Sequence, residues 1–245
     1  MQIIRSTSPS PTFNLAAEEY FFSERQDDLL FLYVNESSVI IGCNQAIRNE
    51  VDLVFCAENN IQIVRRMSGG GAVYHDFGNL NYCFIKNKIP GEFPLGGEFL
   101  KPIVQVLQDL NIDVQIGKRK DLWLPGGHKI SGTASHIGKT RELHHGTLLY
   151  DCNLENLQKS LSPKIVEPFK KAIASVPSPV KNIRALLIEQ SVNVPDSQTF
   201  FESFAQKLLE FYNLESVSFL LEVDIVEIQK LQRGKYEDSE WTRKK

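Results

Sequence analysis

The sequence predicts an α+β fold in which mixed or antiparallel β-sheets are flanked by helices. Short runs rich in β-branched and aromatic residues, such as LLFLYVN and SSVIIGCN, are typical of strands. Longer segments with apolar residues spaced by three and four are typical of amphipathic helices. Because the two kinds of segment do not alternate regularly, the pattern favours an α+β fold over repeated βαβ units. With 245 residues and 42% hydrophobic composition, the chain can bury a substantial core.

The first third of the chain predicts one helix followed by strands. The segment NLAAEEYFF, residues 14–22, contains good helix formers, and we expect Asn14 to act as its N-cap. Only a short polar turn separates residues 29–35 from residues 37–44, which predicts a hairpin or two adjacent strands. The next expected elements are a short helix around residues 51–55, a strand at 61–66, a glycine-rich loop and a strand at 82–87.

The remainder predicts a helix, a second sheet-rich unit and a long helix. Apolar residues Ile103, Val104, Leu107 and Leu110 share one face of a helix at 100–110, which is expected to cover the sheet. The expected strands of the second unit are residues 113–117, 121–124, 128–135 and 146–151, with a charged loop at 139–142. An apolar stripe containing Phe200, Phe201, Phe204, Leu208 and Leu209 predicts a helix at 198–212. The polar residues 233–245 are expected to form an exposed end.

Composition and charge argue against several classes of protein. No run of about eighteen apolar residues is present, and the first residues lack the features of a signal peptide. We therefore expect a cytoplasmic protein with no membrane partner. The four cysteines are scattered without a CxxC pair, which predicts neither a zinc site nor a disulfide framework. A formal net charge of −3 provides no overall attraction to nucleic acid.

The most informative segment is RRMSGGGAVYHD, residues 65–76. Glycines lack a Cβ, so successive backbone N–H groups can converge on phosphate or carboxylate oxygens. Arginine adds forked donors that suit the same oxygens. The segment contains neither a GxxxxGK[ST] phosphate loop nor a GxGxxG dinucleotide motif. A flexible turn is the simplest alternative, but the flanking arginines and the following His-Asp favour an anion-binding loop.

Extended to RRMSGGGAVYHDFGNLNY, this segment resembles the signature of the lipoate-protein ligase A family, within the biotin and lipoate ligase superfamily. IIGCNQ resembles a strand end upstream of that signature, and KISGTA and HHGTLL resemble the family's lysine motif and the strand after it. VPSPVKNI and KYEDSEW match later positions, so the resemblance spans most of residues 10–241. It implies one lipoate ligase-like catalytic domain over residues 1–245, without the C-terminal accessory domain of many members.

Lys129, within HKISGTAS, is the residue that the resemblance makes catalytic. Considered alone, it would be a solvated lysine on an edge strand. The resemblance implies that its ammonium holds the acyl carbonyl and the α-phosphate and stabilises the charge that develops there. The substrate and acyl contacts implied by the resemblance are Arg65, Ser68, Gly69, Gly70, Gly71, His75, Ser131, Gly132, Thr133, His145 and Gly146. The implied nucleotide contacts are Arg65, Gly70, Gly71, Val73, Tyr74, Asp121 and Lys129.

Two histidine motifs admit other interpretations. The pair His144 and His145 suggests a metal site, but no third ligand has suitable spacing, so no metal site is predicted. His75 and Asp76 suggest a catalytic dyad. Adjacent residues in a strand point to opposite faces, however, so we expect a structural or nucleotide-orienting role for them.

The resemblance implies acyl transfer in two steps. Lipoate and ATP with Mg²⁺ would give an enzyme-bound lipoyl-AMP and pyrophosphate, and a lysine of an acceptor protein would then attack the carbonyl. The implied acceptors are lipoyl-domain proteins of 2-oxoacid dehydrogenases or the glycine cleavage H-protein. A separate accessory subunit is a further candidate partner.

Two positions depart from the family pattern and leave two alternatives open. The family's Arg-Asn-Asp tripeptide has Lys120 at its centre here, and the arginine that commonly follows the lysine motif is His136. One alternative is an octanoyl or lipoyl transferase that uses a preactivated acyl donor, and the other is a noncatalytic lipoate-binding protein. A thioester-dependent transferase would use a nucleophilic cysteine. Cys152 is only weakly excluded, although an ordinary buried thiol is the simpler interpretation.

Overall fold

The computed structural model of the chain describes residues 1–89, 91, 98–164, 172–190 and 194–244, and it confirms the predicted α+β fold. The strands are β1 Gln2–Arg5, β2 Leu29–Val34, β3 Ser38–Ile41, β4 Gln62–Arg65, β5 Val73–His75, β6 Asn79–Asn87, β7 Gln115–Ile116, β8 Leu122–Leu124, β9 His128–Ser131, β10 Thr133–Ile137, β11 Arg141–Leu149 and β12 Ser218–Phe219. The α-helices are α1 Pro11–Glu24, α2 Ile47–Glu50, α3 Leu53–Glu58, α4 Lys101–Asp109, α5 Leu154–Ser160, α6 Ile183–Glu189, α7 Ser197–Tyr212, α8 Glu222–Leu231 and α9 Ser239–Arg243. A 3-10 turn at Glu98–Leu100 precedes α4, and a π-helical turn at Gln232–Tyr236 follows α8.

Six strands form the main sheet, in the order β10-β11-β6-β2-β1-β12. The first four pair in antiparallel fashion, whereas β1 pairs in parallel with both β2 and β12.

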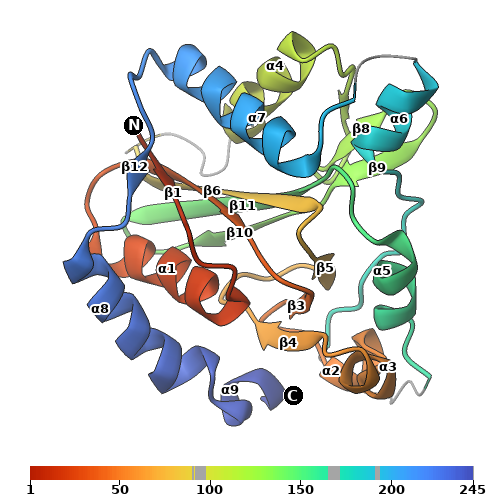
Figure 1. Ribbon diagram of the computed structural model, residues 1–245. Coiled ribbons are helices and arrows are strands. Elements are labelled where there is room, and N and C mark those ends of the chain that lie inside the picture. The colour runs from red at the N-terminus through yellow and green to blue at the C-terminus, as the bar shows by residue number, and fades with distance from the viewer. Residues whose placement is uncertain (90, 92–97, 165–171, 191–193, 245) are drawn as a thin grey trace.

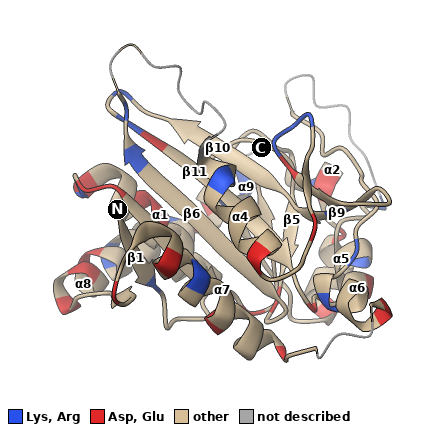
Figure 2. Cartoon of the chain, turned by 90° about the horizontal axis from the view of Figure 1, so that it is seen from above, with Lys and Arg blue, Asp and Glu red and all other residues tan. Residues whose placement is uncertain are grey.

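Alternate residues of β2 face opposite sides, as a strand requires. Leu30 and Leu32 pack in the cluster that contains α4 and α7, whereas Leu29 and Phe31 pack with α1 and α8. The sheet is therefore the middle of three layers (Figure 1). Seen from above, α4 and α7 lie across its strands, and residues of both charges are spread over the outer elements (Figure 2).

Two three-stranded sheets accompany the main sheet. In β4-β3-β5, β3 is parallel to β4 and antiparallel to β5. In β7-β8-β9 both pairings are antiparallel. These small sheets matter for function because they carry the glycine-rich loop and Lys129.

The predicted pairing of residues 29–35 with residues 37–44 was wrong. β2 pairs with β1 and β6 in the main sheet, whereas β3 pairs with β4 and β5 in a different sheet. Both strands are apolar and almost fully buried on both faces. Their hydrophobic patterns therefore carry no information about which neighbour each one takes.

The predicted N-cap of the first helix was also wrong. The helix begins three residues earlier, where the Ser10 side chain accepts a hydrogen bond from the Phe13 N–H and Pro11 occupies the first turn. Asn14 is fully buried inside α1, and its amide donates to Asn35 Oδ1 and to the Ser8 carbonyl at 2.8 Å each. Asn14 thus joins the helix to the end of β2 instead of capping the helix.

Two boundaries differ in the sheet-rich segment after α4. Gly132 divides the predicted strand 128–135 into β9 and β10, which belong to different sheets. The predicted charged loop at 139–142 extends into β11, which begins at Arg141. The buried Arg141 guanidinium donates to the carbonyls of Arg25 and Asp27 at 2.7 Å each. These bonds engage both terminal nitrogens of the guanidinium, whereas its buried Nε has no hydrogen-bond partner among the described residues.

The expectation of an exposed C-terminal end was wrong for part of that segment. The chain from residue 233 continues through the π-helical turn into α9, and Tyr236 is 2% exposed. Its hydroxyl donates to Glu19 at 2.6 Å, and the Trp241 indole N–H donates to the Arg65 carbonyl at 2.8 Å. Aromatic anchors spaced along a polar segment hold it against the core.

The two amphipathic helices predicted from apolar periodicity are confirmed as α4 and α7. Ile103 and Leu107 of α4 are fully buried, and the apolar stripe of α7 packs in the same cluster. In the described part of the chain, no helix is long and apolar enough to cross a membrane.

Candidate active site

A cavity of about 290 Å³ opens where the three sheets approach one another. The predicted site residues that line it are Gly70, Gly71, Val73, His75, Asp121, Lys129, Gly132, Thr133, His145 and Gly146. Residues 173–176 form a further wall. Five predicted residues do not line the cavity, namely Arg65, Ser68, Gly69, Tyr74 and Ser131.

Of the two consecutive arginines, Arg66 is the one that faces this cavity, which Arg119 also lines. Its guanidinium donates to Ser68 Oγ at 2.9 Å and to the carbonyls of Ile40 and Gly71 at 3.0 and 2.8 Å. Burial lowers the pKa of Arg66 to about 10, so it remains protonated at neutral pH. The side chain is therefore a cation held rigidly beneath the glycine loop.

The structure does not support the predicted anion contact for Arg65. Arg65 ends β4, and consecutive strand residues point to opposite sides, so its side chain points away from the cavity that Arg66 faces. It is fully buried, and its guanidinium donates to backbone carbonyls of the β3–α2 turn and of α9. With two arginines in sequence, the motif alone could not show which one faces the ligand.

The three glycines have different surroundings. Gly70 has φ of 82°, which disfavours residues with a side chain. A Cβ on Gly71 would lie 2.9 Å from Ser175 Oγ, whereas a Cβ on Gly69 would have nothing within 4 Å. The Ser175 hydroxyl also accepts a hydrogen bond from the Ala72 N–H at 2.8 Å. The loop thus requires glycine where its backbone meets the cavity and residue 175.

Lys129 lies on β9, across the cavity from the loop. Its Nζ is 3.3 Å from Asp121 Oδ2, and its side chain is 18% exposed. Burial lowers the pKa of Lys129, an effect that the Asp121 carboxylate partly offsets. Burial alone would raise the pKa of Asp121, but the Trp123 hydrogen bond and the Lys129 charge bring it below its usual value. The pair is a partly accessible ammonium with an ionised partner.

Small residues of β10 and β11 form the wall between these two cations. Gly132, Thr133 and Gly146 line the cavity, and a Cβ on Gly146 would lie 2.3 Å from the Tyr82 hydroxyl oxygen. Ser131 does not reach the cavity, because its Oγ lies 3.1 Å from that same Tyr82 hydroxyl. Gly146 therefore lacks a side chain where Tyr82 packs, whereas a Cβ on Gly132 would meet the side chains of Lys129 and Val73 only at 3.6 Å or more.

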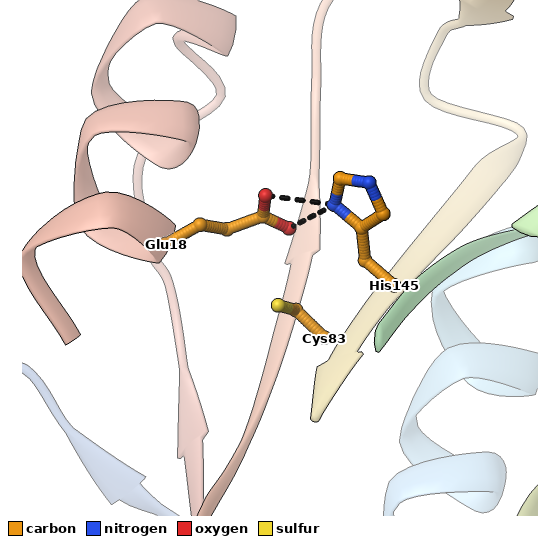
Figure 3. Close-up of side chains that lie close together, drawn as sticks. All are labelled: Glu18, Cys83 and His145. Atoms are coloured by element: carbon orange, nitrogen blue, oxygen red, sulfur yellow. Dashed lines mark hydrogen bonds and ion pairs between the residues drawn. The ribbon is translucent and has the colours of Figure 1, made fainter. Parts of the chain in front are cut away.

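A buried chain of hydrogen bonds supports the loop, and Figure 3 shows the contact between Glu18 and His145 within it. Glu18 of α1 accepts from Tyr33 at 3.0 Å and lies 2.8 Å from His145 Nδ1. His145 Nε2 is 2.7 Å from Ser68 Oγ, which accepts from Arg66. Ser68 therefore supports Arg66 from behind the cavity wall. Sequence reasoning missed Glu18, although a carboxylate three residues after Leu15 on a buried helical face was a usable signal.

Glu18, His145 and Cys83 have ligand atoms that all lie within 4.8 Å of one another, a separation that a metal ion could bridge. Hydrogen bonds already occupy the Glu18 carboxylate and both nitrogens of His145. His144, which the sequence places beside His145, points to the other face, where its Nδ1 is 2.9 Å from Ser135 Oγ. Sequence spacing could not reveal the spatial cluster, since its members come from three separate elements.

His75 and Asp76 point to different surroundings, in agreement with their predicted separation. His75 Nδ1 is 2.9 Å from the Asn35 amide nitrogen, and Asp76 accepts from the N–H groups of Gly78 and Asn153. Burial and the nearby Arg66 charge lower the pKa of His75 to about 3, so its ring is neutral. Its Nε2 is buried and has no hydrogen-bond partner in the described structure.

The predicted nucleotide contact of Tyr74 is not supported by its side chain. Tyr74 packs with Val39 and Ile41 on the other face of β5, and its hydroxyl is 3.3 Å from Ser37 Oγ. Val73, before it in the strand, does line the cavity. Alternation along β5 separates the two residues.

Lys120 and His136, the two positions that depart from the family pattern, lie in different parts of the structure. Lys120 has φ of 58°, and its carbonyl accepts from the Thr133 hydroxyl at 2.8 Å. His136 is on β10, packs edge-on against Phe22 and does not line the cavity. Neither departure disturbs the contact between Asp121 and Lys129.

Cys152 is a buried thiol outside the described cavity lining. Burial, with Asp76 nearby, raises its pKa, which opposes formation of a thiolate. That lining, as far as the structure describes it, contains no cysteine.

Comparisons with known proteins agree with this geometry. A family model described as the lipoyl protein ligase A/B catalytic domain matches residues 10–209. Lipoate-protein ligase LplJ of Bacillus subtilis is 34% identical over 239 residues, which cover 94% of this chain and 70% of the relative. The mitochondrial lipoyl amidotransferase of Mus musculus is 40% identical over 186 residues, which cover 74% of this chain and 49% of the relative. The solved structure of a bi-partite lipoate protein ligase of Thermoplasma acidophilum, studied with its E2 lipoyl domain, has a TM-score of 0.79 at 24% identity. That alignment covers 99% of this chain and 96% of the other, and it shows a shared fold.

Proposed function

The chain belongs to the lipoyl protein ligase A/B catalytic domain family, and we propose that it joins lipoate to a lysine of lipoyl-domain proteins, through a lipoyl adenylate made from ATP. The observation that carries this proposal is the pairing of two cations across one cavity. Arg66 lies beneath a loop of backbone amides, and Lys129 lies opposite, with a wall of small residues between them. The cations and the loop amides would bind phosphate and carboxylate oxygens, and the wall of small residues would contact an extended acyl chain.

The chemistry requires an activated carbonyl. A carboxylate oxygen of lipoate attacks the α-phosphorus of ATP, and pyrophosphate leaves. The acceptor lysine, as the free amine, then attacks the acyl carbonyl and displaces AMP, and the amine proton is lost to solvent. Positioning and electrostatic stabilisation are the protein's contribution to both steps. In this proposal Mg²⁺ accompanies ATP as part of the substrate.

The roles assigned to individual residues follow their position in the cavity. Lys129 contacts the carbonyl oxygen and the α-phosphate. Arg66 and the amides of Gly70 and Gly71 contact phosphate oxygens, in place of the contact first expected from Arg65. The nucleotide also contacts Val73 and Asp121. The acyl chain extends along Gly132, Thr133, His145 and Gly146.

The decisive experiment measures the intact mass of an acceptor. The purified chain is incubated with lipoate, MgATP and an apo lipoyl domain or apo H-protein, and parallel reactions omit ATP or supply preformed lipoyl-AMP. A lipoyl increment that depends on ATP supports the complete proposal. An increment with lipoyl-AMP alone would restrict the activity to the transfer step. No increment in either reaction would contradict the proposal.

A transferase that uses a preactivated donor is the second candidate, because one relative is a lipoyl amidotransferase. The buried Cys152 argues against a cysteine-dependent version of that chemistry. Supplying an octanoyl thioester of acyl carrier protein in the same mass assay separates the two activities. Octanoylation without ATP would favour the transferase. A noncatalytic role would instead give lipoate binding with no acceptor modification under any condition.

A further inference from the structure

Arg65 lies outside the cavity but directly beside the turn that supports it. Its Nη1 donates to the carbonyls of Gly42 and Gln45 at 2.8 and 2.9 Å, in the turn between β3 and α2. Its Nε and Nη2 donate to the Thr242 carbonyl at 3.1 and 2.9 Å, and Nε also contacts the Trp241 carbonyl. Among the described residues, no carboxylate forms an ion pair with Arg65. One guanidinium therefore joins two segments that are about two hundred residues apart in the sequence.

Helix α9 is attached to β4 by more than this guanidinium. The Trp241 indole N–H donates to the Arg65 carbonyl at 2.8 Å. The Lys235 ammonium lies 4.1 Å from the centre of the Trp241 ring, a cation–π geometry. Figure 1 shows α9 beside β4, on the side away from α4 and α7.

The turn that Arg65 holds is in contact with the glycine loop. A Cβ on Gly42 would lie 2.3 Å from the Gly70 carbonyl oxygen, so the two backbones touch. The Cys43 N–H donates to the Ser68 carbonyl at 2.9 Å. The Gln45 amide donates to Ser175 Oγ at 3.0 Å, and Ser175 binds the loop at Ala72. Movement of this turn would therefore move the loop.

We infer that Arg65 and Trp241 are positioning residues, through which helix α9 sets the place of the backbone amides at residues 70–72. A buried guanidinium needs partners for all its N–H groups, so the turn and the helix must move together or leave donors unsatisfied. Displacement of a binding group by about 1 Å can lower a reaction rate about a hundredfold. The inference rests on the proposed function, because it assumes that these amides bind nucleotide phosphates.

The test compares two buried arginines of the same kind. Arg65→Lys keeps the charge but loses the forked donors. Arg141→Lys does the same at the start of β11, where the guanidinium also donates to two backbone carbonyls and does not line the cavity. We expect both variants to lower the midpoint of thermal unfolding. Arg65→Lys should raise KM for ATP about tenfold and change KM for lipoate less than twofold, whereas Arg141→Lys should change neither.

Hydrogen–deuterium exchange gives a readout that does not depend on activity. Exchange of the amides at residues 66–72 should be faster in Arg65→Lys than in Arg141→Lys. Trp241→Phe should accelerate it in the same direction but less, and this milder variant serves if Arg65→Lys does not fold. Equal exchange in the two lysine variants, or an accelerated loop with unchanged KM for ATP, would overturn the inference. A wild-type chain without ligase activity would refute the proposed function instead, and the exchange comparison would still test the coupling.

Discussion

Arg66 and Lys129, two of the cations that line the cavity, are presented in opposite ways. Arg66 is buried and donates to Ser68 and to the backbone carbonyls of Ile40 in β3 and Gly71 in its own loop, so its position is fixed before any ligand arrives. Among the described residues, Lys129 has one carboxylate partner, Asp121, and its side chain is partly exposed. The difference indicates that Arg66 maintains the shape of the loop. In the proposed reaction, the more accessible Lys129 ammonium is the group that contacts the carbonyl oxygen and the α-phosphate.

Removal of Lys129 should have the largest effect. In the proposed reaction, Lys129→Ala loses a contact to the developing charge, and we expect kcat/KM for acceptor lipoylation to fall by about 10²–10³. The midpoint of thermal unfolding should stay within a few degrees, because the side chain is not part of an apolar cluster. The mass assay measures the rate, and the exposed Lys159→Ala is the matched control. Equal activity in the two variants would remove Lys129 from the mechanism.

A substitution within the loop should have a smaller effect. Gly71→Ala places a methyl group 2.9 Å from Ser175 Oγ, so the loop or residue 175 must shift. We expect KM for ATP to rise about tenfold, on the order of 1.4 kcal/mol of binding free energy. Gly69→Ala meets no atom within 4 Å and is the control. Similar KM values for both variants would show that the loop is more adaptable than its hydrogen bonds indicate.

The smallest effect at neutral pH concerns two buried histidines, His75 and His144. The pKa values of His75 and His144 are lowered from 6.5 to about 3, chiefly by burial. The unfolded chain binds these protons first, so the free energy of unfolding should fall as pH drops from 6.5 toward 3. His75→Gln should make this decline shallower in urea titrations at several pH values, whereas the exposed His128→Gln should leave it unchanged. An unchanged slope in His75→Gln would argue against a buried neutral ring.

The sequence predicted the fold class, the two amphipathic helices and most of the residues around the cavity. Amphipathic periodicity reports burial on one face, and α4 and α7 have one buried face each. Periodicity could not predict that β2 pairs with β6. A strand that is apolar on both faces has the same hydrophobic pattern toward every candidate neighbour. Strand partners depend on contacts between distant segments, which local patterns do not encode.

The same limit explains why the side-chain geometry does not support the contacts expected of Arg65 and Tyr74. Alternation along a strand separates Arg65 from Arg66 and Tyr74 from Val73, but only the direction of the strand shows which member of each pair faces the ligand. Glu18 supports His145 from an element 127 residues away. Buried polar networks of this kind depend on residues that are close in space but distant in sequence. A motif that matches a family can also assign a ligand contact to a residue whose side chain points to the other face of the strand.

The contact between residues 65 and 241 also has a consequence for the order of events during synthesis. The indole of Trp241 is 176 residues beyond its partner in the chain. At about 5–20 residues per second, a ribosome needs on the order of ten seconds or more to add that length. Until α9 has been synthesised, the Arg65 guanidinium lacks two of its carbonyl partners. The glycine loop would therefore reach its final conformation late. Capture of nucleotide by a ribosome-bound chain should therefore begin only after α9 has emerged.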